Sequence, residues 1–277
     1  MAGRIAFQGA PGAYSHEACQ EACPEMEAMP CDTFEDVVEA VRSGAADLAM
    51  LPVENSTYGR VADIHSLLPQ SGLHIIGEAF VRVRICLMAL PGVTLDQVER
   101  VRAHLVLLPQ ARRFLAEHGI RPETAADSAG AAAELVRAGT PGTGVLASAL
   151  AARTYGLEVL ASDIEDHGHN TTRFLIMSRE PDLARRGNDG MMTTFVFQVR
   201  NIPAALYKAM GGFATNGVNM TKLESYMVDG SFTATQFYAD IEGHPEDPAV
   251  KRALDELDYF TKELKILGVY PADPKRH

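Results

Sequence analysis

The chain has 277 residues, of which 47% are hydrophobic and 22% charged, and its formal net charge is -11. This length suggests about two domains, and the apolar content excludes a disordered or fibrous chain. An acidic chain without long runs of Lys and Arg is a poor match for nucleic acid. No stretch approaches the roughly 18 apolar residues of a membrane span, and the first residues show no targeting signal. The sequence therefore predicts a cytoplasmic globular protein that binds neither nucleic acid nor membrane.

Strand and helix patterns alternate along the first two thirds of the chain. An apolar strand at 4–8 leads into a glycine-containing turn, 9–15, and a helix that ends near Cys23. Period-two alternation over 73–90 predicts one long strand. The other elements predicted in this part are helices near 32–44, 61–72, 109–117 and 128–138, and strands near 48–51, 101–105, 144–147, 157–161 and 174–177. Such alternation is typical of α/β proteins with parallel sheets.

A break in the pattern separates the last third of the chain. Residues 178–192 carry prolines, glycines and charges without periodicity, which is typical of a linker. The elements predicted beyond it are strands near 194–200, 218–227, 231–242 and 265–270 and helices near 204–214 and 249–263. This βαββαβ order predicts a ferredoxin-like unit, whose exposed faces often pair with a second copy.

Three segments, 9–15, 52–59 and 169–174, place polar groups next to apolar strands, where open α/β sheets bind ligands. The amides of the first turn could bind an anion, although a plain strand-to-helix turn would look the same. The second carries a carboxylate, an amide and hydroxyls, as a surface loop also could. In the third, Arg173 offers a planar fork for a carboxylate, or forms a surface ion pair. We expect Thr172 and Arg173 to precede a strand that begins at Phe174.

Metal ligation is not indicated by the cysteines or by the two loop histidines, His167 and His169. Cys19 and Cys23 lie one helical turn apart, but no second ligand pair accompanies them. We therefore predict no metal site, with the cysteines acting as small hydrophobic side chains.

Together, the three segments resemble the signature motifs of prephenate dehydratase. The matching residues are the turn at 9–15, Pro-Val-Glu-Asn-Ser at 52–56 with Gly59, and Asn170 followed by Thr-Arg-Phe at 172–174. Tyr155-Gly156-Leu157, Ile164 and Asp166 match the family's run into the last motif. The motifs occur in the family's order and the resemblance covers nearly the whole chain. The last third resembles an ACT domain, the phenylalanine-sensing module that these enzymes carry.

The chain departs from the family pattern in two regions. His104 and Gln110 fall within the family's Ser-His-Pro-Gln-Ala-Leu-Ala-Gln run, but most of the intervening residues differ. In the ACT unit, Ala204 replaces the glycine of Pro-Gly-Ala-Leu, and Tyr226 and Met227 replace the arginine and proline of Glu-Ser-Arg-Pro. These last changes lie where the family binds its regulatory amino acid, so feedback control by phenylalanine stays an open question.

The resemblance implies a carbon–oxygen lyase that converts prephenate to phenylpyruvate, water and carbon dioxide in L-phenylalanine biosynthesis, without a cofactor. Two alternatives remain: an arogenate dehydratase and a non-catalytic amino-acid sensor. Thr172 is the expected hydrogen-bond donor to the leaving hydroxyl, and Glu54, if protonated, is the competing acid. Asn55 and Ser56 would orient the substrate. The residues expected to bind substrate are Arg173, Phe174, Gly12, Tyr14, Ser15 and Asn170.

The family's architecture implies a two-lobed catalytic domain, similar to type 2 periplasmic binding proteins, over residues 1–180. The expected divisions are lobe 1 at 1–77 and 163–180, lobe 2 at 78–162, a linker at 181–192 and an ACT regulatory domain at 193–277. The expected L-phenylalanine effector residues are Ala204, Ala205, Leu206, Asn216, Asn219, Glu224 and Ser225. Pairing of ACT domains would give a homodimer or a homotetramer.

Overall fold

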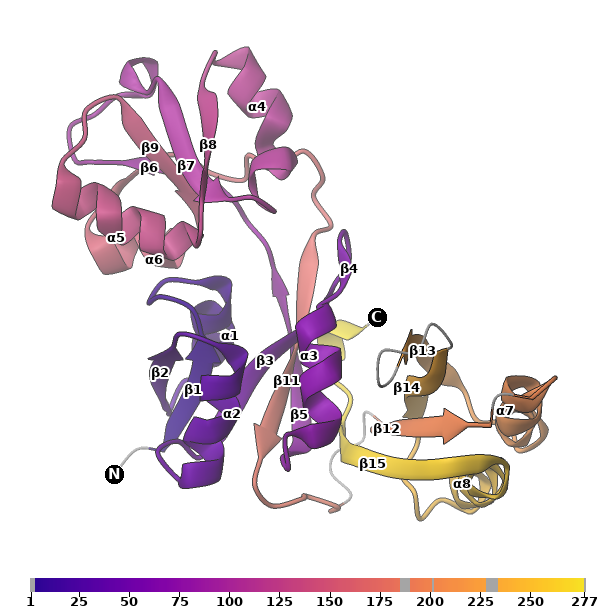
Figure 1. Ribbon diagram of the computed structural model, residues 1–277. Coiled ribbons are helices and arrows are strands. Elements are labelled where there is room, and N and C mark those ends of the chain that lie inside the picture. The colour runs from indigo at the N-terminus through magenta and orange to yellow at the C-terminus, as the bar shows by residue number, and fades with distance from the viewer. Residues whose placement is uncertain (1–2, 185–189, 201, 228–233, 277) are drawn as a thin grey trace. The chain divides into compact units, whose positions relative to one another are not determined.

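The computed structural model describes residues 3–184, 190–200, 202–227 and 234–276. The chain divides into a first unit, residues 1–61 and 80–174, and a second unit, residues 62–79 and 175–277 (Figure 1). The predicted linker at 181–192 includes residues 185–189, which lie outside the described residues. The functional division into a catalytic and an ACT domain stays a prediction.

Parallel strands form one sheet region of the first unit. Its elements are β1 (Arg4–Gln8), α1 (Tyr14–Ala22), β2 (Glu27–Cys31), α2 (Phe34–Ser43) and β3 (Leu48–Asn55). Strand β1 lies between β3 and β2 and is parallel to both. Helix α2 begins with a capping box between Thr33 and Asp36, close to the predicted start of this helix near residue 32. Because β1 and β3 are parallel, the turn after β1 and the end of β3 leave the sheet at the same edge.

Two strands extend further than the sequence indicated. Strand β3 continues past Pro52 to Asn55 and pairs with β4 (Gly59–Arg60). Proline is tolerated there because β1 pairs only with Leu48–Met50, so the sheet does not need a donor from residue 52 on that side. Strand β11 (Thr171–Ser178) begins three residues before Phe174, which corrects the expected start. Glu54, Asn55, Thr172 and Arg173 therefore lie on strands rather than on loops, whereas Ser56 and Asn170 lie just outside the strands.

A second sheet completes the first unit. Its five strands lie in the order β10-β6-β9-β7-β8. Strand β7 is parallel to β8 and β9, whereas β6 is antiparallel to β10 and β9. The predicted single strand at 73–90 is two strands in separate sheet regions, because the chain leaves regular structure over 83–85. The bounds are β5 (His74–Arg82), β6 (Cys86–Ala89), β7 (Arg100–His104), α4 (Arg112–Glu117), β8 (Arg121–Ala125), α5 (Ser128–Ala138), β9 (Thr143–Ala147), α6 (Ala149–Tyr155) and β10 (Glu158–Ala161).

The second unit confirms the predicted βαββαβ order. Its elements are β12 (Met191–Val199), α7 (Ala205–Thr215), β13 (Met220–Met227), β14 (Ala234–Glu242), α8 (Pro248–Phe260) and β15 (Thr261–Pro271), with α3 (Ala62–Leu67) from the earlier segment. Phe195 and Phe197 of β12 pack with Phe213 of α7 and Leu257 of α8, so both helices cover one face of the sheet. The strand order is β13-β14-β12-β15, followed by β5. Gly268 permits that last pairing, since a Cβ there would lie 2.2 Å from the Ile75 carbonyl oxygen.

Short 3-10 turns connect several of these elements. They are η1 (Leu68–Gln70), η2 (Leu95–Gln97), η3 (Leu108–Ala111) and η4 (Pro274–Arg276). Across the part of the chain that the structure describes, no helix has both the length and the apolar character needed to cross a membrane.

Candidate active site

The side-chain amide of Asn55, the last residue of β3, organises the candidate site. Its Oδ1 accepts the backbone N–H groups of Thr57 and Tyr58, at 2.9 and 3.0 Å. These two donors fix the orientation of the amide, because a nitrogen in that place could not accept them. The Asn55 Nδ2 group therefore faces the other way, where it donates to Asn170 Oδ1 at 2.6 Å and to Thr172 Oγ1 at 3.0 Å.

The hydrogen-bond chain continues from Asn170 to a residue that the sequence analysis did not assign to the site. Asn170, which is 3% exposed, donates from Nδ2 to Gln110 Oε1, and Gln110 Nε2 donates to the Val106 carbonyl at 2.9 Å. Backbone groups thus bind the amides at both ends of this hydrogen-bond chain. Each side-chain amide therefore has one allowed orientation. The signal that could have found Gln110 was its place in the partly matching family run.

This arrangement determines what the Thr172 hydroxyl can do. Because its Oγ1 accepts a hydrogen bond from Asn55, its own hydrogen is directed elsewhere and can be donated to a ligand. Accepting one hydrogen bond also polarises the O–H group and strengthens its donation of the next. The Thr172 hydroxyl is therefore oriented as a hydrogen-bond donor.

Ser56 joins the end of β3 to the start of β11. Its Oγ donates to the His169 carbonyl at 2.9 Å and accepts the Thr171 N–H at 2.9 Å, and its own N–H donates to the Thr171 carbonyl. These contacts place Ser56 as a brace between the two motifs rather than as a free hydroxyl.

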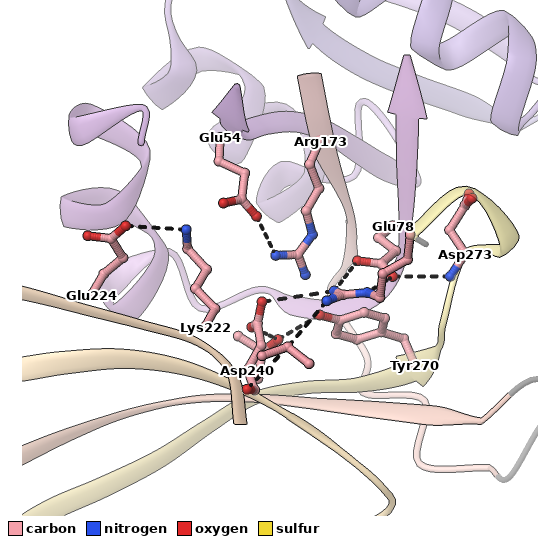
Figure 2. A network of polar contacts seen from close by, with 11 residues as sticks. Glu54, Glu78, Arg173, Lys222, Glu224, Asp240, Tyr270 and Asp273 are labelled. Carbon is pink, nitrogen blue, oxygen red and sulfur yellow. Dashed lines mark hydrogen bonds and ion pairs between the residues drawn. The ribbon is translucent and has the colours of Figure 1, made fainter. Parts of the chain in front are cut away.

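An ion pair between buried Arg173 and partly exposed Glu54 comes from the neighbouring positions of the same two strands. Arg173 is 2% exposed, and its Nη1 lies 2.8 Å from Glu54 Oε1; the two side chains point toward each other from β11 and β3 (Figure 2). Neighbouring positions on the two strands thus carry two contacts: a hydroxyl with the amide that orients it, and a guanidinium with its carboxylate. The structure brings together the second and third motifs that the sequence predicted.

The first motif, the turn after β1, packs against the start of helix α6 of the same unit. Gly12 has a φ of 93°, and a Cβ on it would lie 2.6 Å from Ala151 Cα, so a side chain there is excluded. Ser148 Oγ donates to the Gly12 carbonyl at 2.7 Å, and the Gly12 N–H donates to His16 Nδ1 at 3.0 Å. This amide, which the sequence suggested as an anion donor, is instead engaged by a histidine one helical turn later.

This hydrogen bond gives the first testable expectation, a pH dependence of stability. Burial lowers the pKa of the half-buried His16 imidazole, and a protonated Nδ1 could no longer accept the Gly12 N–H. The unfolded state then binds a proton that the folded state resists, so the contribution is complete above the usual histidine pKa of about 6.5 and is lost as pH falls below it. Urea unfolding of the wild type and His16→Gln from pH 8 to 5 should show a steeper loss for the wild type. Parallel curves would contradict this expectation.

The remaining predicted substrate residues occupy varied places. Tyr14 begins α1 and donates its hydroxyl to the Arg84 carbonyl at 2.9 Å, and burial raises the pKa of this phenol. Ser15 lies partly exposed in the same first turn. Phe174 is 1% exposed, so its ring packs in the interior and anchors β11 next to Arg173.

The predicted effector residues do not converge within one chain. Ala204 caps the start of α7 with a φ of 61°, Leu206 follows, and Asn216 caps the other end, where it bonds to Glu256 and Arg252. Leu206 and Asn216 are ten positions apart along the helix, which is about 15 Å. The other members are Ala205, buried in α7, Asn219, bonded to Glu242, and Glu224 and Ser225 on β13. A pocket shared by both ends of α7 would need a second copy and stays a prediction.

Among the described residues, no group of three or more His, Cys, Asp or Glu side chains is arranged to hold a metal ion. What the site does offer is neutral hydrogen-bond donors and one guanidinium, groups that suit a small organic anion.

The fold and this site define an α/β protein whose neighbouring strands β3 and β11 carry a network of polar side chains. A family model described as prephenate dehydratase matches residues 5–182. The chain belongs to the prephenate dehydratase family, whose members are lyases.

Relatives match this chain along nearly its whole length. A Komagataeibacter europaeus protein described as a bifunctional N-acyl-homoserine lactone acylase/prephenate dehydratase is 54% identical, with 98% of this chain and 97% of that protein covered. Arogenate dehydratase 2 of Petunia hybrida is 38% identical over 98% of this chain and 72% of its own. The solved structure of prephenate dehydratase from Arthrobacter aurescens in complex with L-Phe matches with a TM-score of 0.89 and 31% identity, covering 99% of this chain and 91% of that one.

Proposed function

We propose that this protein is a prephenate dehydratase, which eliminates water and carbon dioxide from prephenate to form phenylpyruvate. The observation that carries the proposal is the Thr172 hydroxyl, which Asn55 orients as a hydrogen-bond donor on β11, the strand that also carries Arg173. Thr172 supplies a donor for a leaving hydroxyl, and Arg173 is the cation that we assign to a carboxylate. Family membership supports the same reaction.

The reaction requires little of the protein beyond positioning the substrate and donating a hydrogen bond to the leaving hydroxyl. As the ring carboxylate leaves as carbon dioxide, the electrons of its C–C bond move into the ring, and the opposite C–O bond breaks with its electrons on oxygen. The departing hydroxide takes up a proton and becomes water, so no base removes a carbon-bound proton. A hydrogen bond from Thr172 would stabilise the charge that develops on the departing oxygen. Holding the substrate in the reactive geometry lowers the barrier further.

We assign Arg173 to a substrate carboxylate and Glu54 to the orientation of Arg173. A carboxylate 2.8 Å from a buried guanidinium is better suited to fix that fork than to donate a proton. Asn55, Asn170 and Gln110 hold the donor, and Ser56 braces the two strands.

Glu54→Gln tests this assignment against the rival in which Glu54 is the acid. The amide keeps the size of the side chain but removes its charge, so we expect a lower kcat/KM with an unchanged shape of the pH-rate profile. Initial rates with prephenate from pH 5 to 9 measure this. A rate that declines with rising pH in the wild type, and no longer does so in the variant, would assign the proton to Glu54.

Incubation of the purified protein with prephenate and, separately, with arogenate tests the activity itself. Phenylpyruvate from the first and phenylalanine from the second are the products to assay, and we expect the larger kcat/KM for prephenate. The plant relatives described as arogenate dehydratases make the second acid the specific alternative. If neither product forms, the non-catalytic sensor becomes the better proposal.

A second candidate activity is amide hydrolysis of N-acyl-homoserine lactones. It is favoured by the 54% identity to the Komagataeibacter europaeus protein whose description names both activities. Release of homoserine lactone from acyl chains of 6 to 12 carbons, followed by mass spectrometry, would test it alongside prephenate turnover. If Thr172→Ala removes dehydratase activity but not lactone acylase activity, the two reactions use different groups.

We also propose that the second unit is an ACT domain that binds L-phenylalanine and pairs with another copy, in a cytoplasmic enzyme. The βαββαβ order and the likeness to the Arthrobacter aurescens structure in complex with L-Phe support this. Saturating L-phenylalanine should raise the melting temperature and lower activity, since a ligand that binds only the folded state stabilises it. Light scattering should give a dimer or tetramer; a monomer at micromolar concentration would contradict the pairing.

A further inference from the structure

A buried ion pair in the second unit, Arg276 with Glu78, is unrelated to any predicted site residue. Glu78 lies on β5 and its side chain is 0% exposed, while Arg276 ends the short turn η4. The guanidinium contacts both carboxylate oxygens, with Nε 2.8 Å from Oε1 and Nη2 2.6 Å from Oε2. The Asp273 N–H donates to the same carboxylate at 3.1 Å (Figure 2). We call this pair the Arg276–Glu78 clamp.

The sequence around Arg276 is built to present it to Glu78. Asp273 Oδ1 accepts the Lys275 N–H at 2.7 Å and the Asp273 carbonyl accepts the Arg276 N–H at 3.0 Å, which closes the turn over Pro274. Proline at the first position of such a turn needs no donor. The local turn therefore directs Arg276 back toward β5.

Buried polar groups surround the clamp and hold Arg276 in place. Asp240 is also 0% exposed, and its Oδ2 lies 4.0 Å from Arg276 Nη2. Thr194 Oγ1 donates to Asp240 Oδ1 at 2.6 Å and lies 2.7 Å from the Tyr270 hydroxyl. Charges this deeply buried must keep their partners, so losing the guanidinium would disturb the backbone that carries Glu78.

The strand that carries Glu78 leads directly to the candidate active site. Strand β5 begins in the second unit and its last residues, 80–82, belong to the first. Val83 follows, and its N–H donates to the Asn170 carbonyl at 2.8 Å. Asn170 is the residue that links Gln110 to Asn55 and so to Thr172. Extended chain has almost no slack over the five residues from Glu78 to Val83.

We propose that Arg276 is a positioning residue for the active site, acting through Glu78 and β5 on the Val83–Asn170 hydrogen bond. By fixing Glu78, the clamp keeps β5 in place, and Val83 in turn holds the amide chain that orients Thr172. The reaction it serves is the proposed dehydration, so this inference rests on the proposed function. It assigns a role in catalysis to a residue in the sensor-like unit.

The test compares Arg276→Gln with Lys275→Gln, which removes a positive charge from the same turn. We expect Arg276→Gln to lower kcat about tenfold with KM within twofold, and Arg276→Lys to lose less, because it keeps the charge but not the fork. Lys275→Gln should match the wild type. Amide hydrogen exchange at Val83, followed by mass spectrometry or NMR, should become faster in Arg276→Gln alone.

A double variant keeps the test decisive if Arg276→Gln folds poorly. Glu78→Gln with Arg276→Gln replaces the ion pair by two neutral amides and should lose no more kcat than Arg276→Gln, because both changes remove one contact. Wild-type kcat and unchanged Val83 exchange in Arg276→Gln, with a lowered melting temperature only, would overturn the proposal. If the wild type itself turns over no prephenate, the proposed function fails, and Val83 exchange still decides whether the clamp reaches Asn170.

Discussion

Replacing Thr172 by alanine is expected to lower kcat for prephenate about 100-fold while KM changes much less. The hydroxyl accepts from Asn55 at 3.0 Å and is thereby directed to donate outward. A donor aimed at an oxygen that gains charge only as its bond breaks stabilises the transition state more than the bound substrate, and its loss appears in kcat. Steady-state rates of phenylpyruvate formation measure both constants.

Thr172→Ser is the matched control, since serine keeps the hydroxyl and loses only a methyl group. It should retain most of the wild-type kcat, because Asn55 can still orient its oxygen. Thermal unfolding of both variants should resemble that of the wild type, as residue 172 is only partly buried. Near-normal turnover by Thr172→Ala would remove this residue from the proposed role.

Arg173→Lys is expected to lower kcat/KM roughly 10- to 100-fold, because hydrogen bonds to charged groups contribute about 1.5–3 kcal/mol. Lysine keeps the positive charge beside Glu54 but lacks the planar fork that binds one carboxylate with two N–H groups. Arg173 is 2% exposed, so removing its charge altogether would break a buried contact with Glu54, and a loss of substrate binding could not be told from a loss of folding. The conservative change therefore separates the two effects.

Arg84→Lys provides the same chemical change at an exposed side chain whose ion pair with Asp163 spans 3.9 Å. Exposed ion pairs with such long distances contribute little to stability. The kcat and KM of Arg84→Lys should therefore equal those of the wild type. Identical kinetic constants for Arg173→Lys and Arg84→Lys would show that the fork of Arg173 does not touch the substrate.

The fold could be predicted best where hydrophobic periodicity and turn residues marked the helices and strands clearly. The βαββαβ order of the second unit follows from hydrophobic periodicity and turn residues, and the structure confirms it. The predicted strand over 73–90 was wrong, because periodicity continues through 83–85 although the chain changes sheets there. The strand predicted near 48–51 continues to Asn55, because the neighbouring strand decides whether Pro52 must donate a hydrogen bond.

In the candidate site, too, local sequence predicted some features and tertiary contacts decided others. The motifs around Glu54 and Thr172 were identifiable because several functional groups follow one another along the chain. Gln110 was missed as a site residue, since its contact is with Asn170, sixty positions away. The hydrogen bonding of Gly12 to His16 was likewise invisible, because it depends on the turn's dihedral angles.

By itself, the sequence determined the α/β class, the ferredoxin-like last third and the residue types that an elimination from an anionic substrate requires. These follow from short-range order: the period of apolar residues, turn chemistry and adjacent polar groups. Only the tertiary structure decided that Asn55 orients Thr172, that Glu54 pairs with Arg173, and that Arg276 closes on Glu78. Each of these contacts joins residues more than a hundred positions apart, and its geometry is set by the packing of strands that no local pattern describes.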